Sequence, residues 1–353
     1  MKRNFGVMLT IILALTLVLS ACGAKNENNT GGNKPAETNA PEATKAPEAA
    51  KSDLKIGMVT DTGGVNDKSF NQSAWEALQK VTTDTGVKTK YLESHGDADM
   101  EPNLNAFVSE KFDLVWGIGF LFNDAMAKVA AANPDTKFGL IDSEVKAPNV
   151  ESVLFAENEG SFLVGVVAGL MTKTDKIGFV GGIKSQVIQK FEAGFKAGIT
   201  AVNPDAKLHV IYAGEFGKPD LGKAAATTIY NDGADIIFHA AGATGNGVFN
   251  EAKDRKKNGE NVWVIGVDKD QSLEYGDDIT LTSMMKGVEA AVYKISKDLS
   301  EGTWTGGTAV TLGLKDNGVG LPETNKNVPA DVLAKVDEYK AKIISGEIVV
   351  PTE

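Results

Sequence analysis

The stretch Leu54–Val81, LKIGMVTDTGGVNDKSFNQSAWEALQKV, contains the signals of a strand, a turn and a helix in that order. The apolar run at 54–60 is typical of a buried strand, and the spacing of apolar residues over 73–81 is typical of a helix. The turn between them, Asp61–Asn71, holds two glycines, two carboxylates, a hydroxyl, an aromatic ring and an amide. This order predicts a parallel α/β fold with functional side chains at the carboxyl end of the strand.

The same alternation continues along the chain. Helical patterns separate most of the apolar runs, and Val187, Phe191, Phe195 and Ile199 mark one helical face. Strands that are apolar throughout, with helices between them, indicate parallel sheets covered on both faces. The strands and the length of 353 residues favour two doubly wound lobes, with a (β/α)₈ barrel as the rival arrangement. Further strands are predicted at 87–93, 113–119, 137–142, 152–156, 176–182, 207–213, 235–241 and 262–268.

The N-terminus is typical of an export signal. Lys2 and Arg3 precede a short apolar run at 7–19, and LSAC (Leu19–Cys22) resembles the bacterial lipobox, in which the cysteine is lipidated. A plain signal peptide with an incidental cysteine is the alternative. We expect a signal peptide at 1–21, lipidation at Cys22 and a disordered tether at 22–53, which is rich in Ala, Pro, Asn, Glu and Lys. Removal of the signal changes the net charge from −11 to −11 − 2 = −13.

Composition and motifs argue against several function classes. A net charge of −11 opposes nucleic acid as a partner. His95, His209 and His239 lack metal-ligand spacing, and we expect the last two to be packed strand residues. The mature domain contains no cysteine nucleophile, and no G-x-S-x-G motif occurs. We therefore expect a binding protein without a metal or cofactor, although paired carboxylates for glycoside hydrolysis remain an alternative.

Residues just after the predicted strands indicate the ligand, because parallel sheets bind ligands at their carboxyl ends. Glycines, carboxylates and aromatic residues dominate these positions, and none of the glycine-rich segments has the register of a phosphate-binding loop. The set favours a neutral polyhydroxy or aromatic ligand. Its members are Asp61, Phe120, Asp124, Gly181–Gly182, Gly214–Phe216, Gly242–Gly245 and Asp268.

The segment KIGMVTDTGGVNDKSFNQSAWEAL (Lys55–Leu78) resembles the opening signature of the Bmp family, the purine nucleoside receptor A-like (PnrA-like) lipoproteins of ABC transporters. The similarity extends over nearly all of 54–351, for example in EGSFLVGVVAGLMTKTDKIGFVGG (Glu159–Gly182) and TSMMKGVEAAVY (Thr282–Tyr293). This resemblance implies the type I periplasmic-binding-protein fold, two Rossmann-like lobes joined by a hinge of three crossings. It places the N-terminal lobe at 54–157 plus about 285–308, and the C-terminal lobe at 158–284 plus about 309–353.

The resemblance also implies a binding site in the interlobe cleft. Phe70 and Phe216 would stack on the two faces of a base, while Asn71 and Asp124 would bond its edge. Asp61 would line the cleft. The ribose would be held by Gly242 or Gly245, Asp268 and Lys286.

Each of these assignments has a simpler structural alternative. Asp67 and Ser69 are expected mainly as caps of the helix that follows. Phe70 could be a core residue, as Trp75 is expected to be. Lys286 is expected to begin a helix, an unfavourable position for a cation, and this indicates another use.

The resemblance implies a lipid-anchored, extracytoplasmic substrate-binding protein at the cell membrane that delivers nucleosides, with purine nucleosides favoured, to an ABC permease and its ATPase. We expect a monomer. Alternatives are a binding protein for a sugar or signalling molecule, and an extracellular nucleoside hydrolase.

Overall fold

The structure is a computed structural model that describes residues 52–353. The predicted signal peptide, the lipidation at Cys22 and nearly all of the predicted tether lie outside the described residues. Among the helices of residues 52–353, none combines the length and apolar character that a membrane span requires.

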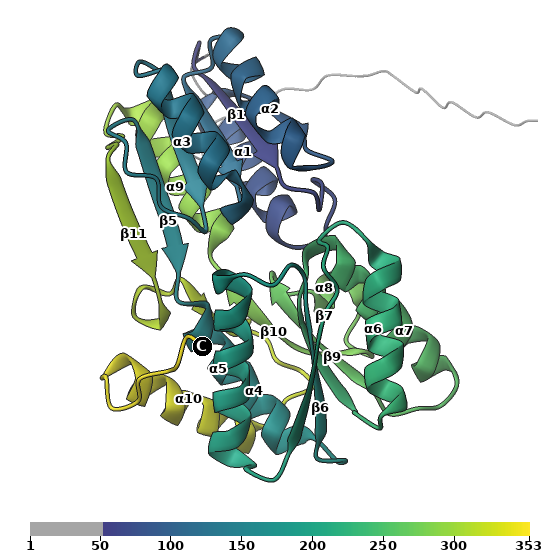
Figure 1. Ribbon diagram of the computed structural model, residues 1–353. Helices are drawn as coiled ribbons and strands as arrows, with labels where there is room; N and C mark the ends of the chain where they lie inside the picture. The colour runs from purple at the N-terminus through teal and green to yellow at the C-terminus, as the bar shows by residue number, and fades with distance from the viewer. Residues whose placement is uncertain (1–51) are drawn as a thin grey trace, which may run out of the picture. The chain divides into compact units, whose positions relative to one another are not determined.

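The first of two sheets is entirely parallel and has six strands (Figure 1). Its order, 2-1-3-4-5 followed by a late strand, is that of a doubly wound sheet. From one edge to the other it contains β2 (Lys88–Glu93), β1 (Lys55–Thr60), β3 (Leu114–Ile118), β4 (Lys137–Ile141), β5 (Val150–Phe155) and β11 (Thr308–Leu312).

The second sheet repeats this order. Its last strand is antiparallel and all the others are parallel. The strands are β7 (Lys207–Tyr212), β6 (Lys176–Gly181), β8 (Ile236–Ala240), β9 (Trp263–Asp268), β10 (Thr280–Lys286) and β12 (Val319–Gly320).

Helices cover both faces of each sheet. On the first sheet, α1 (Phe70–Thr85) and α9 (Val288–Glu301) pack together on one face, and α2 (Asp97–Ser109) and α3 (Asn123–Ala132) lie on the other. On the second sheet, one face carries α4 (Glu157–Met171) with α5 (Gln186–Val202), and the opposite face carries α6 (Pro219–Asn231) with α7 (Gly245–Lys257). The short α8 (Ser272–Tyr275) follows β9, and α10 (Ala330–Ile344) packs on α4.

The strand sequences explain why helices cover both faces of each sheet. In β3, Leu114, Trp116 and Ile118 join the core beneath α1 and α9, while Val115 joins the core beneath α2 and α3. All four are fully buried. The apolar side chains of β3 therefore serve two opposite faces, as in parallel sheets generally.

The chain passes between the two sheets three times, after β5, after β10 and after β11. The first and third crossings touch, because the amide of Ala156 donates to the carbonyl of Leu312 at 3.0 Å. The amide of Gly287, at the second crossing, donates to the carbonyl of Gly318 at 2.8 Å. The segment that returns to the first sheet thus continues through β11 to Leu312, beyond the predicted limit of about 308.

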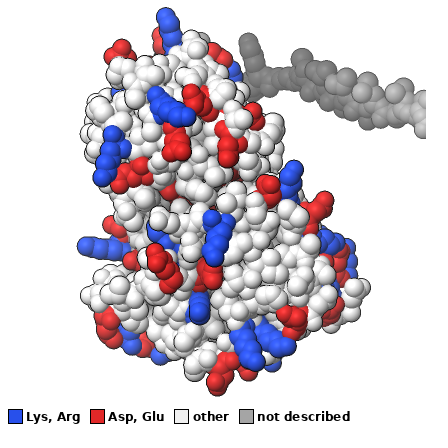
Figure 2. Space-filling view, viewed as in Figure 1, with Lys and Arg blue, Asp and Glu red and all other residues white. Residues whose placement is uncertain are grey.

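The structure confirms the two-lobed fold and excludes the barrel. All nine predicted strands are present, and the helical face at 187–199 lies in α5. On the face shown in Figure 2, acidic and basic side chains are interspersed over both lobes, without the continuous basic stripe that binds nucleic acid.

Candidate functional site

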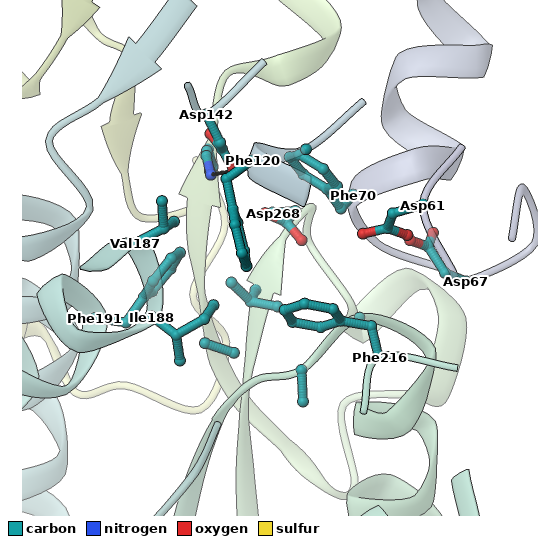
Figure 3. Close-up of a pocket in the computed structure, with 16 residues that line it drawn as sticks. Asp61, Asp67, Phe70, Phe120, Asp142, Val187, Ile188, Phe191, Phe216 and Asp268 are labelled. Carbon is teal, nitrogen blue, oxygen red and sulfur yellow. Dashed lines mark hydrogen bonds and ion pairs between the residues drawn. The ribbon is translucent and has the colours of Figure 1, made fainter. Parts of the chain in front are cut away.

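The carboxyl ends of both sheets face one cavity (Figure 3). Its volume is about 50 Å³. Loops after β1, β3, β4, β7 and β8 contribute to the wall, together with the last residues of β8, β9 and β10 and the starts of α1 and α5. The lining residues are Asp61, Asp67, Phe70, Gly119, Phe120, Asp142, Val187, Ile188, Phe191, Phe216, Ala240, Ala241, Gly242, Val267, Asp268 and Lys286.

The turn after β1 begins helix α1 through one carboxylate. Asp67 accepts backbone N–H groups of Ser69 and Asn71, both at 2.9 Å, and of Gln72 at 3.1 Å. These are amides of the helix start that have no partner within the helix. The expectation that Asp67 caps α1 is therefore confirmed.

Ser69 does not cap the helix, contrary to expectation. Its hydroxyl donates instead to the carboxylate of Asp268, at the end of β9 in the other lobe. Both residues are buried. The turn thus joins the two lobes beside the cavity.

Asn71 holds two carboxylates in place. Its Nδ2 donates to Asp61 Oδ1 at 2.7 Å and to Asp67 Oδ2 at 3.0 Å, and its Oδ1 accepts the amide of Asp61 at 3.3 Å. Asn71 is 1% exposed and is absent from the cavity wall. In this structure it positions the carboxylates rather than facing the cavity.

Lys286 is the main buried cation of the cavity. Its Nζ lies 2.6 Å from Asp142 Oδ2 and 3.2 Å from Glu157 Oε1, and 5.0 Å from the centre of the Phe70 ring. Burial lowers the pKa of Lys286, but the carboxylates of Asp142, Glu157 and Asp268 outweigh burial and raise it. The interpretation that Lys286 begins a helix is wrong, since it ends β10 and α9 begins at Val288.

Asp142 is a cavity residue that the sequence analysis did not assign to the site. Asp142 directly follows β4, and Asp268 is the last residue of β9, so the two residues occupy equivalent places in the two sheets. Each has a φ of 66°. A left-handed backbone is uncommon for aspartate and is typical of functional sites. The matching ends of the two strand sequences, GLID (139–142) and IGVD (265–268), were the available signal.

One oxygen of Asp142 faces no partner. Its Oδ2 pairs with Lys286, while its Oδ1 is buried and has no hydrogen-bond partner among the described residues. A buried carboxylate oxygen without a donor is costly. A ligand N–H or O–H in the cavity would supply that donor.

Negative charge exceeds positive charge around the cavity. Burial raises the pKa of Asp61, Asp67, Asp142 and Asp268 to about 6 in each case. Hydrogen bonds from Asn71 oppose this shift at Asp61, and the charge of Lys286 opposes it at Asp142 and Asp268. The site therefore disfavours an anionic ligand and offers several acceptors.

Four phenyl rings lie around the same space, one of them that of Phe191 in α5 (Figure 3). Phe70 begins α1 and Phe120 follows β3, both in the first lobe, while Phe216 follows β7 in the second. The ring centres of Phe120 and Phe216 are 6.1 Å apart, with 73° between the ring planes. These rings offer flat apolar faces to a ligand. Phe120 is a wall residue that its position after a predicted strand indicated, although the family resemblance gave it no role.

The structure brings six predicted residues to the cavity and leaves three outside. Asp124 is exposed on α3, and Gly245 packs against the buried ring of His239. Asn71 lies behind Asp61. The residues at the wall are Asp61, Phe70, Phe216, Gly242, Asp268 and Lys286.

The histidines and acids of the described residues make no metal site. Among residues 52–353 no group of three or more His, Cys, Asp or Glu side chains is arranged to hold an ion. His239 is fully buried in β8, and burial lowers its pKa to about 4. His209 is partly exposed on β7 and pairs with Asp232 at 2.7 Å.

Comparison with known proteins places this chain in a family. Residues 54–353 match the family model of Bmp, described as ABC transporter substrate-binding protein PnrA-like. The chain belongs to the Bmp family. It is 45% identical to the CD4+ T-cell-stimulating antigen of Listeria innocua, over 99% of both chains. It is 38% identical to the ABC transporter nucleoside-binding protein BmpA of Lactococcus lactis, over the full length of both.

A solved structure supports the same assignment. An ABC transporter solute-binding protein from Aeropyrum pernix superposes with a TM-score of 0.79 at 30% identity, covering 85% of this chain and 94% of that one. Bmp proteins are substrate-binding proteins of ABC transporters and not enzymes. Membership implies a location outside the cytoplasm at the membrane, with a permease and an ATPase as partners.

Proposed function

We propose that this Bmp protein binds a nucleoside in the cavity, with purine nucleosides favoured, for delivery to its permease. The observation that carries the proposal is the unpartnered Oδ1 of Asp142 beside the rings of Phe70 and Phe120. A nucleoside combines a flat base that stacks on phenyl rings with N–H and O–H donors for buried carboxylates.

The charges favour a nucleoside over a nucleotide. Lys286, the cation that lines the cavity, is already paired with Asp142 and Glu157. A phosphate would meet Asp61 and Asp268 without a free cation to balance it. The name of the relative from Lactococcus lactis, a nucleoside-binding protein, agrees with this choice.

Binding requires the cavity to enlarge. Its volume of about 50 Å³ is far below the roughly 300–1,000 Å³ of ordinary small-molecule sites. The wall residues Phe120 and Phe216 come from opposite lobes and face each other. We infer that the lobes separate to admit the ligand and close on it, with hinge motion at the three crossings.

Thermal unfolding against a panel of ligands tests the proposal. Guanosine, inosine, adenosine, a pyrimidine nucleoside, the free bases, nucleoside monophosphates and sugars would each be added to the full chain. A true ligand at about 100 times its Kd stabilises the protein by about 2.7 kcal/mol. We expect nucleosides to raise the melting temperature more than monophosphates do. Stabilisation by sugars alone would contradict the proposal.

A matched pair of variants tests the assigned carboxylate. Asp142→Asn should raise the Kd for the best nucleoside by about tenfold or more, because a hydrogen bond to a charged group is lost. Asp124→Asn alters an exposed carboxylate away from the cavity and should leave the Kd unchanged. Isothermal titration measures both. The reverse result would return the base-contacting role to Asp124.

We also propose that the protein is a monomer anchored through lipid on Cys22. The lipobox-like sequence supports the anchor, and two acyl chains suffice for stable attachment. Cys22→Ser should move the protein from the membrane fraction to the medium. Retention of the variant in the membrane would contradict the anchor.

A further inference from the structure

The two lobes touch through their backbones at one edge of the cavity. Thr62 follows β1 in the first lobe, and Gly217 lies between β7 and α6 in the second. A β-carbon on Gly217 would lie 2.2 Å from the carbonyl oxygen of Thr62 and 3.2 Å from its carbonyl carbon. Contacts this short do not occur, so only glycine fits this position when the lobes are together. We call this contact the Thr62–Gly217 seam.

The seam is continuous with the ligand cavity. Asp61 precedes Thr62 and Phe216 precedes Gly217, and both line the wall (Figure 3). Any displacement at the seam would therefore move a carboxylate of one lobe away from an aromatic ring of the other. A separation of the lobes here would enlarge the same space that a ligand must fill.

The loop of Gly217 is held rigidly on its own lobe. Thr244, fully buried at the start of α7, donates its amide to the carbonyl of Phe216 at 2.8 Å. Its hydroxyl donates to the carbonyl of Glu215 at 2.9 Å and accepts the amide of Lys218 at 2.9 Å. Residues on both sides of Gly217 are thus hydrogen-bonded to one buried side chain, so a shift of the loop away from a clash would break these bonds.

The loop of Thr62 is held as firmly. The amide of Gly63 donates to Asp61 Oδ1 at 2.9 Å, and the amide of Gly64 donates to the carbonyl of Asp61 at 3.3 Å. The amide of Val65 donates to Glu93 Oε1 at 2.7 Å. An added methyl group at Gly217 must therefore be accommodated by movement of one lobe against the other.

We propose that Gly217 is a positioning residue that sets how far the two lobes close. Its missing side chain permits the Thr62–Gly217 seam, and the seam brings Phe216 to the ligand. Any larger residue holds the cleft partly open while each lobe remains folded. The inference rests on the proposed function only for the identity of the ligand.

The substitution Gly217→Ala isolates this effect. The φ of Gly217 is not positive, so alanine is compatible with the backbone there. Gly96→Ala is the matched control, because a β-carbon on Gly96 meets nothing within 4 Å and its φ of −176° suits any residue. Thermal unfolding of both variants should match the wild type and establish that the lobes are folded.

The distance between the two lobes is measured by double electron–electron resonance between two spin labels. Labels are placed at Lys128→Cys on α3 and Lys253→Cys on α7, which are exposed positions on the two lobes. The full chain carries Cys22→Ser, since Cys22 is its sole cysteine. Guanosine, inosine and adenosine are added in turn.

We expect the wild type and Gly96→Ala to show the short distance between the labels that corresponds to this structure. Gly217→Ala should not show that distance. The Kd of Gly217→Ala for the best nucleoside should rise by about tenfold, because the closed form is rarely populated. Closure of Gly217→Ala to the wild-type distance would overturn the inference, as would a wild type that never reaches it. A wild type that closes but ignores all three nucleosides would instead overturn the proposed function.

Discussion

At the scale of single residues, Lys286 supplies the positive charge that offsets the buried carboxylates around the cavity. It is 4% exposed and pairs with two buried carboxylates, Asp142 and Glu157. The rings of Phe70, Phe155 and Phe191 lie within 5.0–5.6 Å of its Nζ. Because the pair members come from different lobes and from the hinge, the ion pairs hold the end of β10 to both sides of the cavity.

Lys286→Met should destabilise the protein by about 3–5 kcal/mol, because it leaves two buried carboxylates without their cation. The loss should be smaller at about pH 5 than at about pH 8. Burial raises the pKa of Asp142 to about 6, so that carboxylate takes up a proton in the acidic range and needs no partner. Denaturant unfolding at the two pH values measures the difference.

Lys294→Met is the matched control for this substitution. The Lys294 side chain is 74% exposed and pairs with Asp298 on the surface of α9. Such pairs contribute about 0–1 kcal/mol. An equal loss of stability in both variants would show that Lys286 has no special role.

Residue types at the site could be predicted better than side-chain directions. Asp61, Phe120, Phe216 and Asp268 were named because they come at the ends of predicted strands, and all four line the cavity. Phe70, which begins α1, was assigned through the family resemblance. Asp124 fails because it lies one residue into α3, on a side of the helix that faces solvent. Helix rotation and loop geometry decide such cases, and neither is specified by position after a strand.

At the scale of elements, α4 and α5 approach closely enough for their backbones to touch. A β-carbon on Gly194 would lie 2.1 Å from the carbonyl oxygen of Asn158. One on Gly198 would lie 2.0 Å from that of Phe162. The glycines therefore set the spacing of this helix pair, and α5 in turn supplies Ile188 and Phe191 to the cavity.

Gly198→Ala should destabilise the second lobe by about 1–3 kcal/mol, since the methyl group forces two packed helices apart. The higher helix propensity of alanine offsets only about 1 kcal/mol of that cost. Chemical denaturation compares this variant with Gly96→Ala, which adds the same group in open space. Unchanged stability in Gly198→Ala would mean that the helices shift freely.

The strands that the sequence analysis missed share a physical feature. β10 contains Thr280, Thr282 and Ser283 among apolar residues, and β11 is mostly exposed at the edge of its sheet. β12 has only two residues. Apolar runs reveal strands that are buried on both faces, so edge strands and strands with polar residues near the hinge escape the same criterion.

At the scale of the whole molecule, buried acids make stability depend on pH in an unusual direction. Burial raises the pKa of Asp61, Asp67, Asp142 and Asp268 from 3.8 to about 6. Between these values the folded chain holds protons that the unfolded chain has released. The free energy of unfolding therefore decreases as pH rises through this range.

The melting temperature should be a few degrees higher at about pH 5 than at about pH 7.5. The buried His239 opposes this trend, because its pKa is lowered to about 4 and the unfolded chain takes up that proton first. The four aspartates together change the stability with pH more than the single histidine does. Scanning calorimetry across this range measures the slope, and Asp61→Asn should reduce it. A melting temperature that rises steadily from pH 5 to 7.5 would contradict the prediction.

The three crossings also govern the order in which the protein can be completed during synthesis. The first sheet opens with β1 at Lys55 but gains its last strand only at Leu312, after all the parallel strands of the second sheet have been made. Until α9 emerges, α1 alone covers the apolar face that the two helices share. The lobe that begins first therefore finishes after the core strands of the other lobe, so the nascent chain must be kept from aggregating for most of its length.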